Sequence, residues 1–417
     1  MDLNRSKYQP KLRLHPNIWV LAAVSFLTDV SSEMLFNLLP LFLANVLGVR
    51  TAAIGLIDGI AESTASLVKI YSGAISDRLG RRKSLAVLGY GLSTLVKPWL
   101  YFAASWGWVL GIRFADRIGK GIRTAPRDAL LAGSAGQDQR GFAFGLHRMG
   151  DTAGAFTGLG IAALIIWVSQ ADSTRLSREV FQMVVLASII PAGLAVLVLL
   201  LGAREVEKGQ PPDAALPSLR YGWRQMDRRF KAFLVVMVLF TLGNSSDSFI
   251  ILRGQERGLN VLQITGMLLT FNALYSALSG PIGALSDRVD RRKIIVVGWL
   301  LYGLVYLGLA AARTGRQVWA LFGVYGIYYA LTEGVAKALV ADFIPQVQRG
   351  TAYGLFNAAI GLAALPASLL AGILWQGLGR WNGFGPSAPF IFGAFMALVS
   401  GVLLVRWVRI TQENPPV

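Results

Sequence analysis

The sequence predicts an all-α membrane protein with twelve transmembrane helices in two six-helix, pseudo-symmetric halves. Hydrophobic residues make up 54% of the 417-residue chain and charged residues only 15%, which is typical of membrane proteins. Twelve apolar segments are each long enough to cross a bilayer as a helix, for which about 20 residues suffice. A short basic loop also occurs twice, half a chain apart.

The expected spans follow one another with short connections, except at one place. They lie near residues 17–47, 52–77, 83–105, 106–133, 141–169, 178–202, 231–252, 262–286, 294–312, 317–343, 350–375 and 385–409. Between the sixth and seventh spans, Pro211, Pro212 and Pro217 occur among many charged side chains and interrupt the helical pattern. We therefore expect an N-terminal half at 1–203, a cytoplasmic linker at 204–230 and a C-terminal half at 231–417.

The repeated loop reads Gly73-Ala-Ile-Ser-Asp-Arg-Leu-Gly-Arg-Arg-Lys83 in its first copy. The second copy, 210 residues later, reads Gly283-Ala-Leu-Ser-Asp-Arg-Val-Asp-Arg-Arg-Lys293. Each copy ends one apolar segment and begins the next, and its basic side chains cannot enter hydrocarbon without a large cost. Both copies are therefore expected to be tight loops in water between two membrane helices.

This loop resembles the pattern Gly-x-x-x-Asp-Arg-x-Gly-Arg-Arg of the major facilitator superfamily, as does the whole chain. The second copy departs from the pattern at Asp290, where glycine is usual. The resemblance implies a secondary carrier that binds its substrate between two repeated halves near the middle of the membrane. It also implies a conformational latch in which Asp77 docks against the opposite half and Arg81 pairs with Asp128. The residues assigned to this latch are Gly73, Asp77, Arg78, Arg81, Asp128, Asp287, Arg288 and Arg291.

The net charge of +17 is unevenly distributed over the loops. Of the 40 lysines and arginines, 23 fall in the tails and in the loops on one side. The alternate loops contain only eight, namely Arg50, Arg175, Arg178, Arg253, Arg257, Arg313, Arg316 and Arg380. This asymmetry is expected for cytoplasmic loops and argues against nucleic-acid binding. We expect both termini to be cytoplasmic and the protein to lie in a bacterial cytoplasmic (inner) membrane.

Several chemistries are disfavoured by what the sequence lacks. Cysteine is absent and only two histidines occur, which argues against a soft-metal carrier. The chain contains no Gly-x-x-x-x-Gly-Lys-Ser/Thr loop for an ATP-driven pump. It also shows no catalytic constellation apart from the spans. We expect a monomer without cofactor, metal or enzymatic activity, whose partners are a small-molecule substrate, a proton and the lipid bilayer.

Ionisable residues inside the expected spans are the most informative for function. Each costs about 2.5–3.5 kcal/mol at a helix centre, so it normally faces a partner or a wet cavity. In span one, Asp29, Glu33 and Asn37 recur every four residues and share one face. Span two contains Asp58 and Glu62. Neighbouring acids in apolar surroundings suit proton carriage, although Lys69, Lys97 or Arg113 can equally neutralise them.

Span four is the most basic of the spans. Arg113 and Arg117 lie one turn apart, and a cationic stripe facing a cavity attracts an anion. The stretch Arg117-Ile-Gly-Lys-Gly121 resembles the superfamily's span-four motif, which implies a role for Arg117 in proton transfer. For Arg123 and Arg127 we expect instead that the side chains extend to the cytoplasmic surface.

Span five begins with a further candidate for proton coupling. His147 and Asp151 are one turn apart, and imidazole titrates near physiological pH. Gly150, Gly154 and Gly158 recur every four residues and predict a close approach of two helices. This ladder resembles the superfamily's antiporter motif, except that alanine stands at position 155 in place of proline.

The C-terminal half contains fewer charged residues. Its candidates for substrate binding are Asp247, Asn272, Tyr275, Tyr329 and Glu333, joined by Asn37, Arg113 and Arg117 of the N-terminal half. Tyrosines combine an apolar ring with a hydroxyl and suit a ligand of mixed polarity. Glu333 and Lys337 are spaced by four in the favourable order, so we expect them to pair with each other.

These observations predict a proton-coupled secondary transporter that works by alternating access. The basic stripe of span four favours an anionic or zwitterionic organic solute, and export is favoured over import. The acids of spans one and two keep a second possibility open, a multidrug antiporter for lipophilic cations. A third is a facilitator homologue that senses a ligand without transporting it.

Overall fold

A computed structural model describes residues 14–136, 139–206, 226–344 and 349–408. These residues form helices and connecting loops, and no strand occurs among them. The α-helices are α1 (Pro16–Phe36), α2 (Leu39–Asn45), α3 (Thr51–Leu79), α4 (Arg82–Val96), α5 (Trp106–Gly133), α6 (Arg140–Gln170), α7 (Arg178–Gly202), α9 (Arg228–Gly243), α10 (Ser248–Glu256), α11 (Val261–Ser286), α12 (Arg291–Ala311), α13 (Gly315–Phe343), α14 (Arg349–Gln376) and α15 (Ala388–Trp407). A 3₁₀ helix, η1 (Lys97–Phe102), continues α4.

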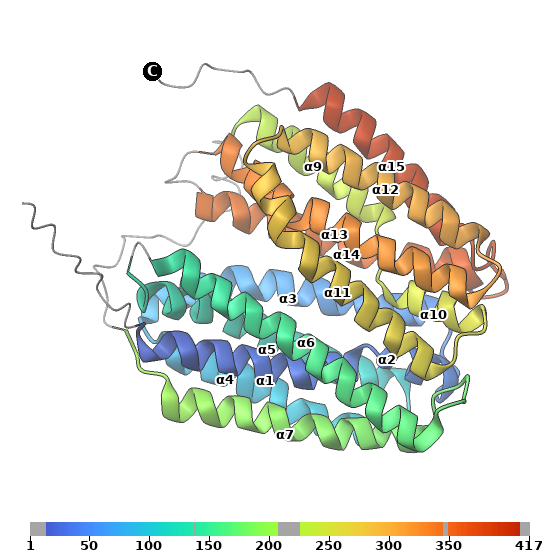
Figure 1. The fold of residues 1–417 in the computed structure, drawn as a ribbon, viewed down its shortest axis with the longest axis horizontal. Helices are drawn as coiled ribbons and strands as arrows, with labels where there is room; N and C mark the ends of the chain where they lie inside the picture. Colours follow the sequence, from blue (N-terminus) through green and yellow to red (C-terminus); the bar gives the residue numbers. More distant parts are fainter. Residues whose placement is uncertain (1–13, 137–138, 207–225, 345–348, 409–417) are drawn as a thin grey trace, which may run out of the picture.

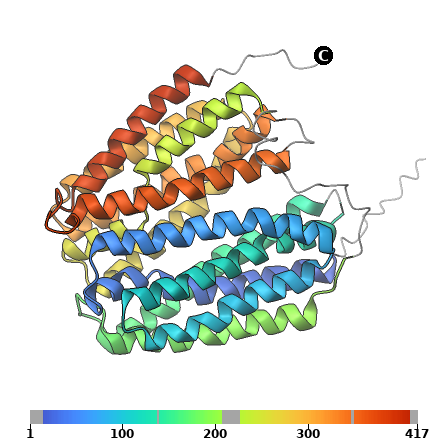
Figure 2. The ribbon, with the colours of Figure 1, turned by 180° about the vertical axis from the view of Figure 1, so that it is seen from behind.

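The helices form two bundles, as the sequence predicts. Helices α1 to α7 make one half and α9 to α15 the other, and the two are seen one above the other in Figure 1 and from behind in Figure 2. Counting α1 with α2, α4 with η1 and α9 with α10, each half contains six spans. The all-α fold class with two six-helix halves is therefore confirmed. The structure does not describe residues 207–225, where most of the predicted linker lies.

Nine of the described helical segments are long and apolar enough to cross a membrane by length and composition alone. The spans outside this set contain α4, α5 and α13. The α-helical part of the third span is only 15 residues long, and α5 contains a series of charged side chains within its length. Helices α4 and η1 nevertheless expose large apolar side chains, among them Leu88, Leu95 and Phe102, as expected of a helix in contact with lipid.

Spans one and seven are each interrupted, which the hydropathy pattern does not predict. In span one, α1 ends at Phe36 and α2 begins at Leu39, with Pro40 in its first turn. In span seven, α9 ends at Gly243 and α10 begins at Ser248. Interrupted helices in corresponding positions of two repeats are characteristic of transporter binding sites, because they expose backbone polar groups inside the protein.

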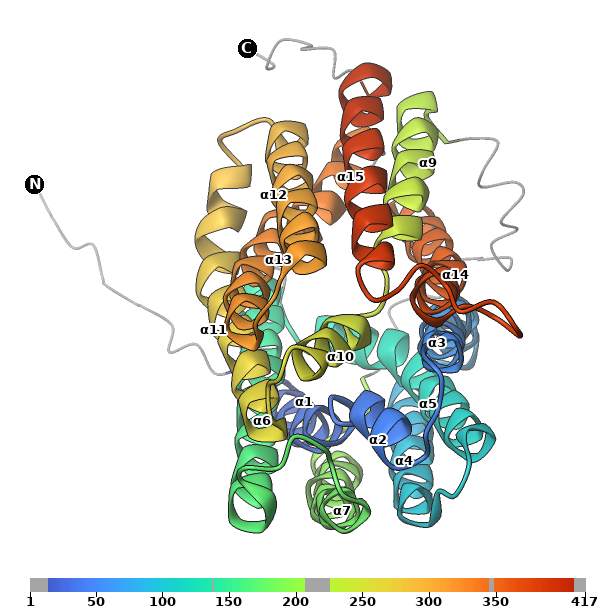
Figure 3. The same ribbon diagram turned by 90° about the vertical axis from the view of Figure 1, so that its right-hand side faces the viewer.

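Glycines determine how closely several helices pack. A Cβ atom on Gly150, Gly154 or Gly158 of α6 would come within 2.4–2.7 Å of a backbone carbonyl oxygen of α1. This confirms the close helix contact predicted from the glycine ladder. Between the halves, a Cβ atom on Gly55 of α3 would lie 2.1 Å from the carbonyl oxygen of Ser368 on α14. Helices α3 and α14 therefore form a tight seam, visible end-on in Figure 3 together with the seam between α6 and α11.

The two copies of the repeated loop differ at the position where the sequence pattern departs. Gly80 ends α3 in the left-handed region, with φ of +63°, a conformation that favours glycine. Asp290 instead has φ of −52°, and its carboxylate accepts a hydrogen bond from the backbone N–H of Arg292 at the start of α12. Burial raises the pKa of the Asp290 carboxyl, but the hydrogen bonds donated by Arg292 outweigh it and lower that pKa. The aspartate is thus a helix cap in a loop that needs no glycine.

Candidate functional site

A polar cavity of about 240 Å³ lies between the two halves, where spans one and seven are interrupted. Helices α1, α3 and α5 line it from one half, and the start of α10 lines it from the other. The lining residues are Asp29, Ser32, Glu33, Phe36, Asn37, Pro40, Asp58, Arg113, Asp116, Arg117, Lys120, Arg123, Ser246, Asp247, Ser248 and Ile251. Seven of them are residues that the sequence analysis selects, now brought together from four helical segments.

Arg113 is the most enclosed cation of this cavity. Its side chain is only 6% exposed, and the guanidinium carbon lies 4.1 Å from the centre of the Phe36 ring. The closest carboxylate oxygens, from Asp58 and Asp116, are 3.9 and 4.0 Å from its nitrogens, which is too far for a hydrogen bond. The buried Nε and Nη1 atoms have no hydrogen-bond partner among the described residues. Arg113 therefore has unused donors in the cavity.

Arg117 lies one turn further along α5 in a similar position. Its nitrogens are 3.9 Å from a carboxylate oxygen of Glu62 and 4.0 Å from one of Asp116. Its buried Nε also lacks a partner among the described residues. Glu62 itself does not line the cavity, and its side chain is 56% exposed.

Asp58 connects the two halves through the cavity. Its Oδ2 atom accepts hydrogen bonds from the hydroxyl groups of Ser248, at 2.5 Å, and Ser246, at 2.8 Å. Ser246 belongs to the interruption of span seven, and Ser248 is the first residue of α10. Because these partners come from the opposite half, the sequence offered no local signal for them.

The acids of span one line the cavity on the α1 side. Glu33 accepts a hydrogen bond from the amide of Asn37 at 2.9 Å. Lys97, buried below the cavity, donates to the hydroxyl groups of Ser31 and Ser32 at 2.7 and 3.0 Å. No described ion pair or hydrogen bond engages the side chain of Asp29. Its carboxylate therefore lines the cavity without a fixed partner among the described residues.

The prediction that Arg123 extends to the surface is wrong. The residue is only 7% exposed and donates to the hydroxyl of Ser93 at 2.7 Å, with its guanidinium 4.6 Å from the Tyr90 ring centre. Both partners are on α4, so no pattern within span four could reveal them. Arg127 is half-buried and pairs with its neighbour Asp128 at 2.8 Å. The sequence analysis also did not select Asp116 and Lys120, which line the cavity.

In the C-terminal half, Asp247 faces the cavity from the end of the interruption. It accepts hydrogen bonds from Tyr325 at 3.1 Å and Tyr329 at 3.4 Å. Tyr325 also donates to the side-chain oxygen of Asn244 at 3.3 Å. Asn272 is not part of this group, because it donates to the Leu268 carbonyl oxygen of its own helix.

A second charged group lies outside the cavity and bridges the seam between α6 and α11. Arg148 donates to the Tyr275 hydroxyl at 2.7 Å, and that hydroxyl donates to Glu333 at 2.5 Å. The expected pair of Glu333 with Lys337 forms at 3.3 Å. On the other side, Arg148 is 3.9 Å from Asp151, which also accepts a hydrogen bond from Ser25.

His147 belongs to the same group, since its Nδ1 atom lies 3.6 Å from a carboxylate oxygen of Asp151. Both residues are on α6, and neither lines the cavity. The predicted proton-coupling residues thus divide between the cavity and this group. Tyr275 and Glu333, predicted to bind substrate, are likewise outside the cavity.

The latch pair of Arg81 with Asp128 is not formed in this conformation, because Asp128 pairs with Arg127. The side chains of Asp77 and Arg78 are outside the described part of the structure, and Gly73 lies on α3 near Ala125. In the second half, Arg291 contacts Asp287 at 2.8 Å and also pairs with Asp342 of α13. Asp287 and Arg288 are exposed. A role of these residues as a latch stays a prediction.

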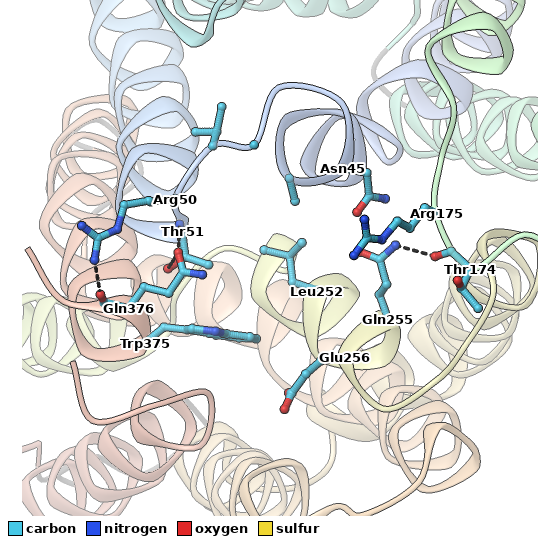
Figure 4. A pocket seen from close by; sticks show the side chains of 13 residues that line it. Asn45, Arg50, Thr51, Thr174, Arg175, Leu252, Gln255, Glu256, Trp375 and Gln376 are labelled. Atoms are coloured by element: carbon cyan, nitrogen blue, oxygen red, sulfur yellow. Dashed lines mark hydrogen bonds between the residues drawn. The ribbon is translucent and has the colours of Figure 1, made fainter. Parts of the chain in front are cut away.

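At the end of the molecule opposite the described chain ends, the halves contact each other through polar groups. Gln376 of α14 accepts a hydrogen bond from the backbone N–H of Thr51, at 2.8 Å, through its side-chain oxygen. Its carbonyl oxygen accepts one from Arg50 at 2.5 Å. Across the same hollow, which has a volume of about 500 Å³, Gln255 donates to the Thr174 carbonyl oxygen at 2.6 Å. Figure 4 shows these contacts.

Comparisons with known proteins agree with this architecture. The family model of the Major Facilitator Superfamily matches residues 21–271 and 233–417. An uncharacterised MFS-type transporter of Methanocaldococcus jannaschii is 35% identical over 398 residues, which are 94% of this chain and 95% of that protein. The multi-drug resistance efflux pump PmrA of Streptococcus pneumoniae is 24% identical over 333 residues, covering 77% of this chain and 80% of the pump.

Among solved structures, a mutant of the nucleoside transporter NupG superposes with a TM-score of 0.80 at 14% identity. The match covers 94% of this chain and 100% of that chain. At this identity the likeness shows the fold, and the family model together with the archaeal relative shows the family. The chain is therefore a multi-pass membrane transporter of the major facilitator superfamily, and not an enzyme.

Proposed function

We propose that this protein is a proton-coupled secondary transporter for a small anionic or zwitterionic organic solute. The observation that supports this most is the state of Arg113 and Arg117. Their guanidinium groups face the cavity between the halves, and three of their buried nitrogens have no hydrogen-bond partner among the described residues. Buried donors of this kind are costly unless something accepts from them. A carboxylate or phosphate on the solute supplies such an acceptor.

The charges of the cavity also suggest how protons take part. Its lining includes four cations, all on α5, and five carboxylates from α1, α3, α5 and the interruption of span seven. A solute anion that binds Arg113 adds a further negative charge, which is compensated when one of the lining acids takes up a proton. Asp29 and Glu33 are the proposed carriers, with Asp58 and Asp247 beside them. The negative charge of a zwitterionic solute is already offset in part by its own ammonium group.

Alternating access follows from where the halves meet. The contacts of Arg50, Thr51 and Gln255 lie at one end, and the tight α3–α14 packing continues from that end as far as Ser66 against Gly361. The described chain ends lie at the opposite end (Figure 1). With the termini in the cytoplasm, as the distribution of lysine and arginine indicates, the end that these contacts close is the one away from the cytoplasm. Export remains the proposed direction, on the basis of the glycine ladder of α6.

A thermal-shift screen of metabolites and drugs on the purified protein tests this proposal, followed by transport of the hits in proteoliposomes. We expect the stabilising compounds to be anions or zwitterions that accumulate against their gradient when a pH gradient is imposed. A protonophore should abolish this accumulation. Accumulation that is insensitive to the protonophore would remove proton coupling from the proposal.

One observation favours a second candidate, a multidrug antiporter for lipophilic cations. The relative from Streptococcus pneumoniae is named a multi-drug resistance efflux pump, and the acids of the cavity could bind a cation. The unused guanidinium donors argue against it, because a cationic ligand leaves them without an acceptor. Stabilisation of the protein by lipophilic cations alone would establish this candidate in place of the first.

A further inference from the structure

A second pocket, of about 250 Å³, lies inside the C-terminal half between α9, α12, α13 and α14. Five of its fifteen lining residues are aromatic, namely Phe240, Trp299, Tyr328, Tyr329 and Phe356. Trp299 is 2% exposed, Phe356 3% and Phe240 4%. An apolar hollow of this depth with a few polar groups at its edge is the usual form of a small-molecule site.

The aromatic side chains around the pocket pack on one another in ordered pairs. Phe240 stacks on Trp299 with ring centres 4.6 Å apart and an angle of 11° between the planes. Tyr328 and Tyr329 meet edge to face with centres 5.3 Å apart. Walls ordered in this way favour stacked or edge-to-face contacts with a further aromatic ring.

Polar side chains lie at the edge of the pocket. Glu333 and Lys337 pair there, and their side chains are 37% and 51% exposed. Asn357 also lines the pocket, and no described hydrogen bond engages its amide group. These groups can satisfy a polar substituent or a ring nitrogen, which an entirely apolar pocket could not.

The pocket and the central cavity meet at the interruption of span seven. Asn244 lines the pocket and Asp247 lines the cavity. The hydroxyl of Tyr325 lies within hydrogen-bond distance of both, at 3.3 and 3.1 Å. Tyr329 lines the pocket, and its hydroxyl donates a hydrogen bond to Asp247. The hydrogen-bonded group of Asn244, Asp247, Tyr325 and Tyr329 therefore lies between the two volumes, which share no lining residue.

We propose that the pocket and the cavity form one two-part substrate site, and that the substrate carries an aromatic or heteroaromatic ring next to its charged group. The charged group binds Arg113 and Arg117, and the ring enters the aromatic pocket. A volume of 250 Å³ corresponds to roughly eight water molecules, which is room for one ring with small substituents. This inference rests on the proposed function and narrows its substrate class.

Matched pairs of probes that share a charged group and differ by a ring test the inference. The pairs are phenylalanine with alanine and phenylpropionate with propionate, and the measurement is their dissociation constant for the purified full-length protein. We expect each ring-bearing probe to bind at least about tenfold tighter than its partner. Equal affinities within both pairs, or no binding of either ring-bearing probe at millimolar concentration, would overturn the inference.

Filling the pocket should remove the ring preference. Ala336 of α13 is 4% exposed and lines the pocket, so Ala336→Phe places a ring where the substrate's ring would lie. We expect this variant to bind both members of a pair with similar affinity. Ala320→Phe, at an exposed position of the same helix, is the control and should keep the wild-type preference. A preference that survives Ala336→Phe contradicts the two-part site.

A milder variant keeps the inference testable if Ala336→Phe does not fold. The natural chain has no cysteine, so Ala336→Cys introduces a unique thiol into the pocket. Phenylalanine should slow the labelling of this thiol by benzyl methanethiosulfonate, and alanine should not. Equal labelling rates with both amino acids would count against the ring pocket.

The outcome for Arg113→Gln separates the two proposals. If this variant weakens both members of each pair while Ala336→Phe leaves the ring preference intact, the ring pocket fails and the proposed function stands. If Arg113→Gln leaves the dissociation constants of all four probes unchanged, the anion-binding part of the proposed function fails. This inference then fails with it.

Discussion

Asp58 and Arg113 form a loose ion pair in the cavity, with 3.9 Å between the closest oxygen and nitrogen. The same carboxylate accepts hydrogen bonds from two serines of the opposite half. It is therefore held between the two halves without satisfying the guanidinium. In the proposed mechanism, an anionic group on the solute takes the place beside Arg113 that Asp58 fills only partly.

Asp58→Asn should therefore increase the affinity for an anion, because it removes the internal competitor for Arg113. We expect phenylpropionate to bind more tightly by up to about fivefold, given that loose ion pairs contribute at most about 1 kcal/mol. Isothermal titration of the two proteins measures this. Asp172→Asn, which removes an exposed carboxylate that does not line the cavity, is the control and should leave the affinity unchanged. Weaker binding in Asp58→Asn would mean that Asp58 contacts the ligand itself.

The pair of Gln376 with Thr51 should hold one end of the molecule closed. Gln376→Ala removes the acceptor for the backbone N–H at the start of α3 and should increase the population that is open at this end. Spin labels introduced by Asp172→Cys and Arg316→Cys, one on each half, should then show longer distances in a double electron–electron resonance measurement.

The control for this experiment is Gln263→Ala, because Gln263 caps a helix within one half by accepting from the backbone N–H of Asn260. It should leave the distance distribution as in the wild type. A distribution unchanged by Gln376→Ala would show that this contact does not hold the end closed.

How far the sequence predicts this structure depends on the range of the interactions. The spans and the loop copies were predictable because lipid requires long apolar helices and excludes charged loops. The close contact of α6 with α1 and the pair of Glu333 with Lys337 were predictable because regular spacing within one helix produces them. These features depend on neighbours in the sequence.

The site was only partly predictable, because its contacts come from distant segments. Arg123 is buried by Tyr90 and Ser93 of another helix, and Asp58 meets its serines across the two halves. The interruption of span seven forms one wall of the cavity, and the hydropathy pattern of the sequence does not predict it. Tyr275 and Glu333, both predicted to bind substrate, contact each other but do not line the cavity.

The two halves should respond differently to loss of an acid near the repeated loop. Arg291 already bridges Asp287 and Asp342 in this conformation, whereas Arg81 and Asp128 do not pair. Asp342→Asn should therefore lower the melting temperature, by an amount that corresponds to about 1 kcal/mol at most for such partly exposed pairs. Asp128→Asn removes the pair with Arg127 and should lower the melting temperature by a similar amount. It should also slow transport, because the pair of Asp128 with Arg81 is expected only when the cytoplasmic end is closed.

Thermal unfolding of both variants, with turnover measured in proteoliposomes, checks this difference. Asp77→Asn should behave as Asp128→Asn does, with slower turnover and nearly unchanged ligand binding. If Asp128→Asn and Asp77→Asn transport at the wild-type rate, these residues do not form a latch.

The coupled proton is expected on Asp29 or Glu33. Replacing the carrier by its amide removes the group that takes the proton, so Asp29→Asn or Glu33→Gln should abolish uphill transport driven by a pH gradient. Exchange of labelled for unlabelled solute should continue, because it needs no net proton movement. Uphill transport and exchange in the same proteoliposomes separate these two activities.

Asp151→Asn is the comparison variant, since Asp151, like His147, does not line the cavity. We expect it to keep uphill transport. If both single amide variants in span one still concentrate the solute as the wild type does, the assignment is wrong, and His147 with Asp151 becomes the next candidate.

The charge of the substrate is tested by three probes that share a phenyl ring, namely phenylpropionate, phenylalanine and phenethylamine. The measurement is the dissociation constant of each for the wild type, for Arg113→Gln and for a control, Arg178→Gln. Arg178 also lies near a phenylalanine ring, that of Phe42, but it is not part of the cavity lining. We expect the anion or the zwitterion to bind the wild type more tightly than the amine.

Arg113→Gln should weaken phenylpropionate and phenylalanine by the roughly 1.5–3 kcal/mol of a hydrogen bond to a charged group, which is at least about tenfold in affinity. Binding of phenethylamine should be unchanged or tighter, and Arg178→Gln should alter none of the three constants. If the amine binds the wild type most tightly, and Arg113→Gln leaves the anion's affinity as it was, the cavity does not bind anions.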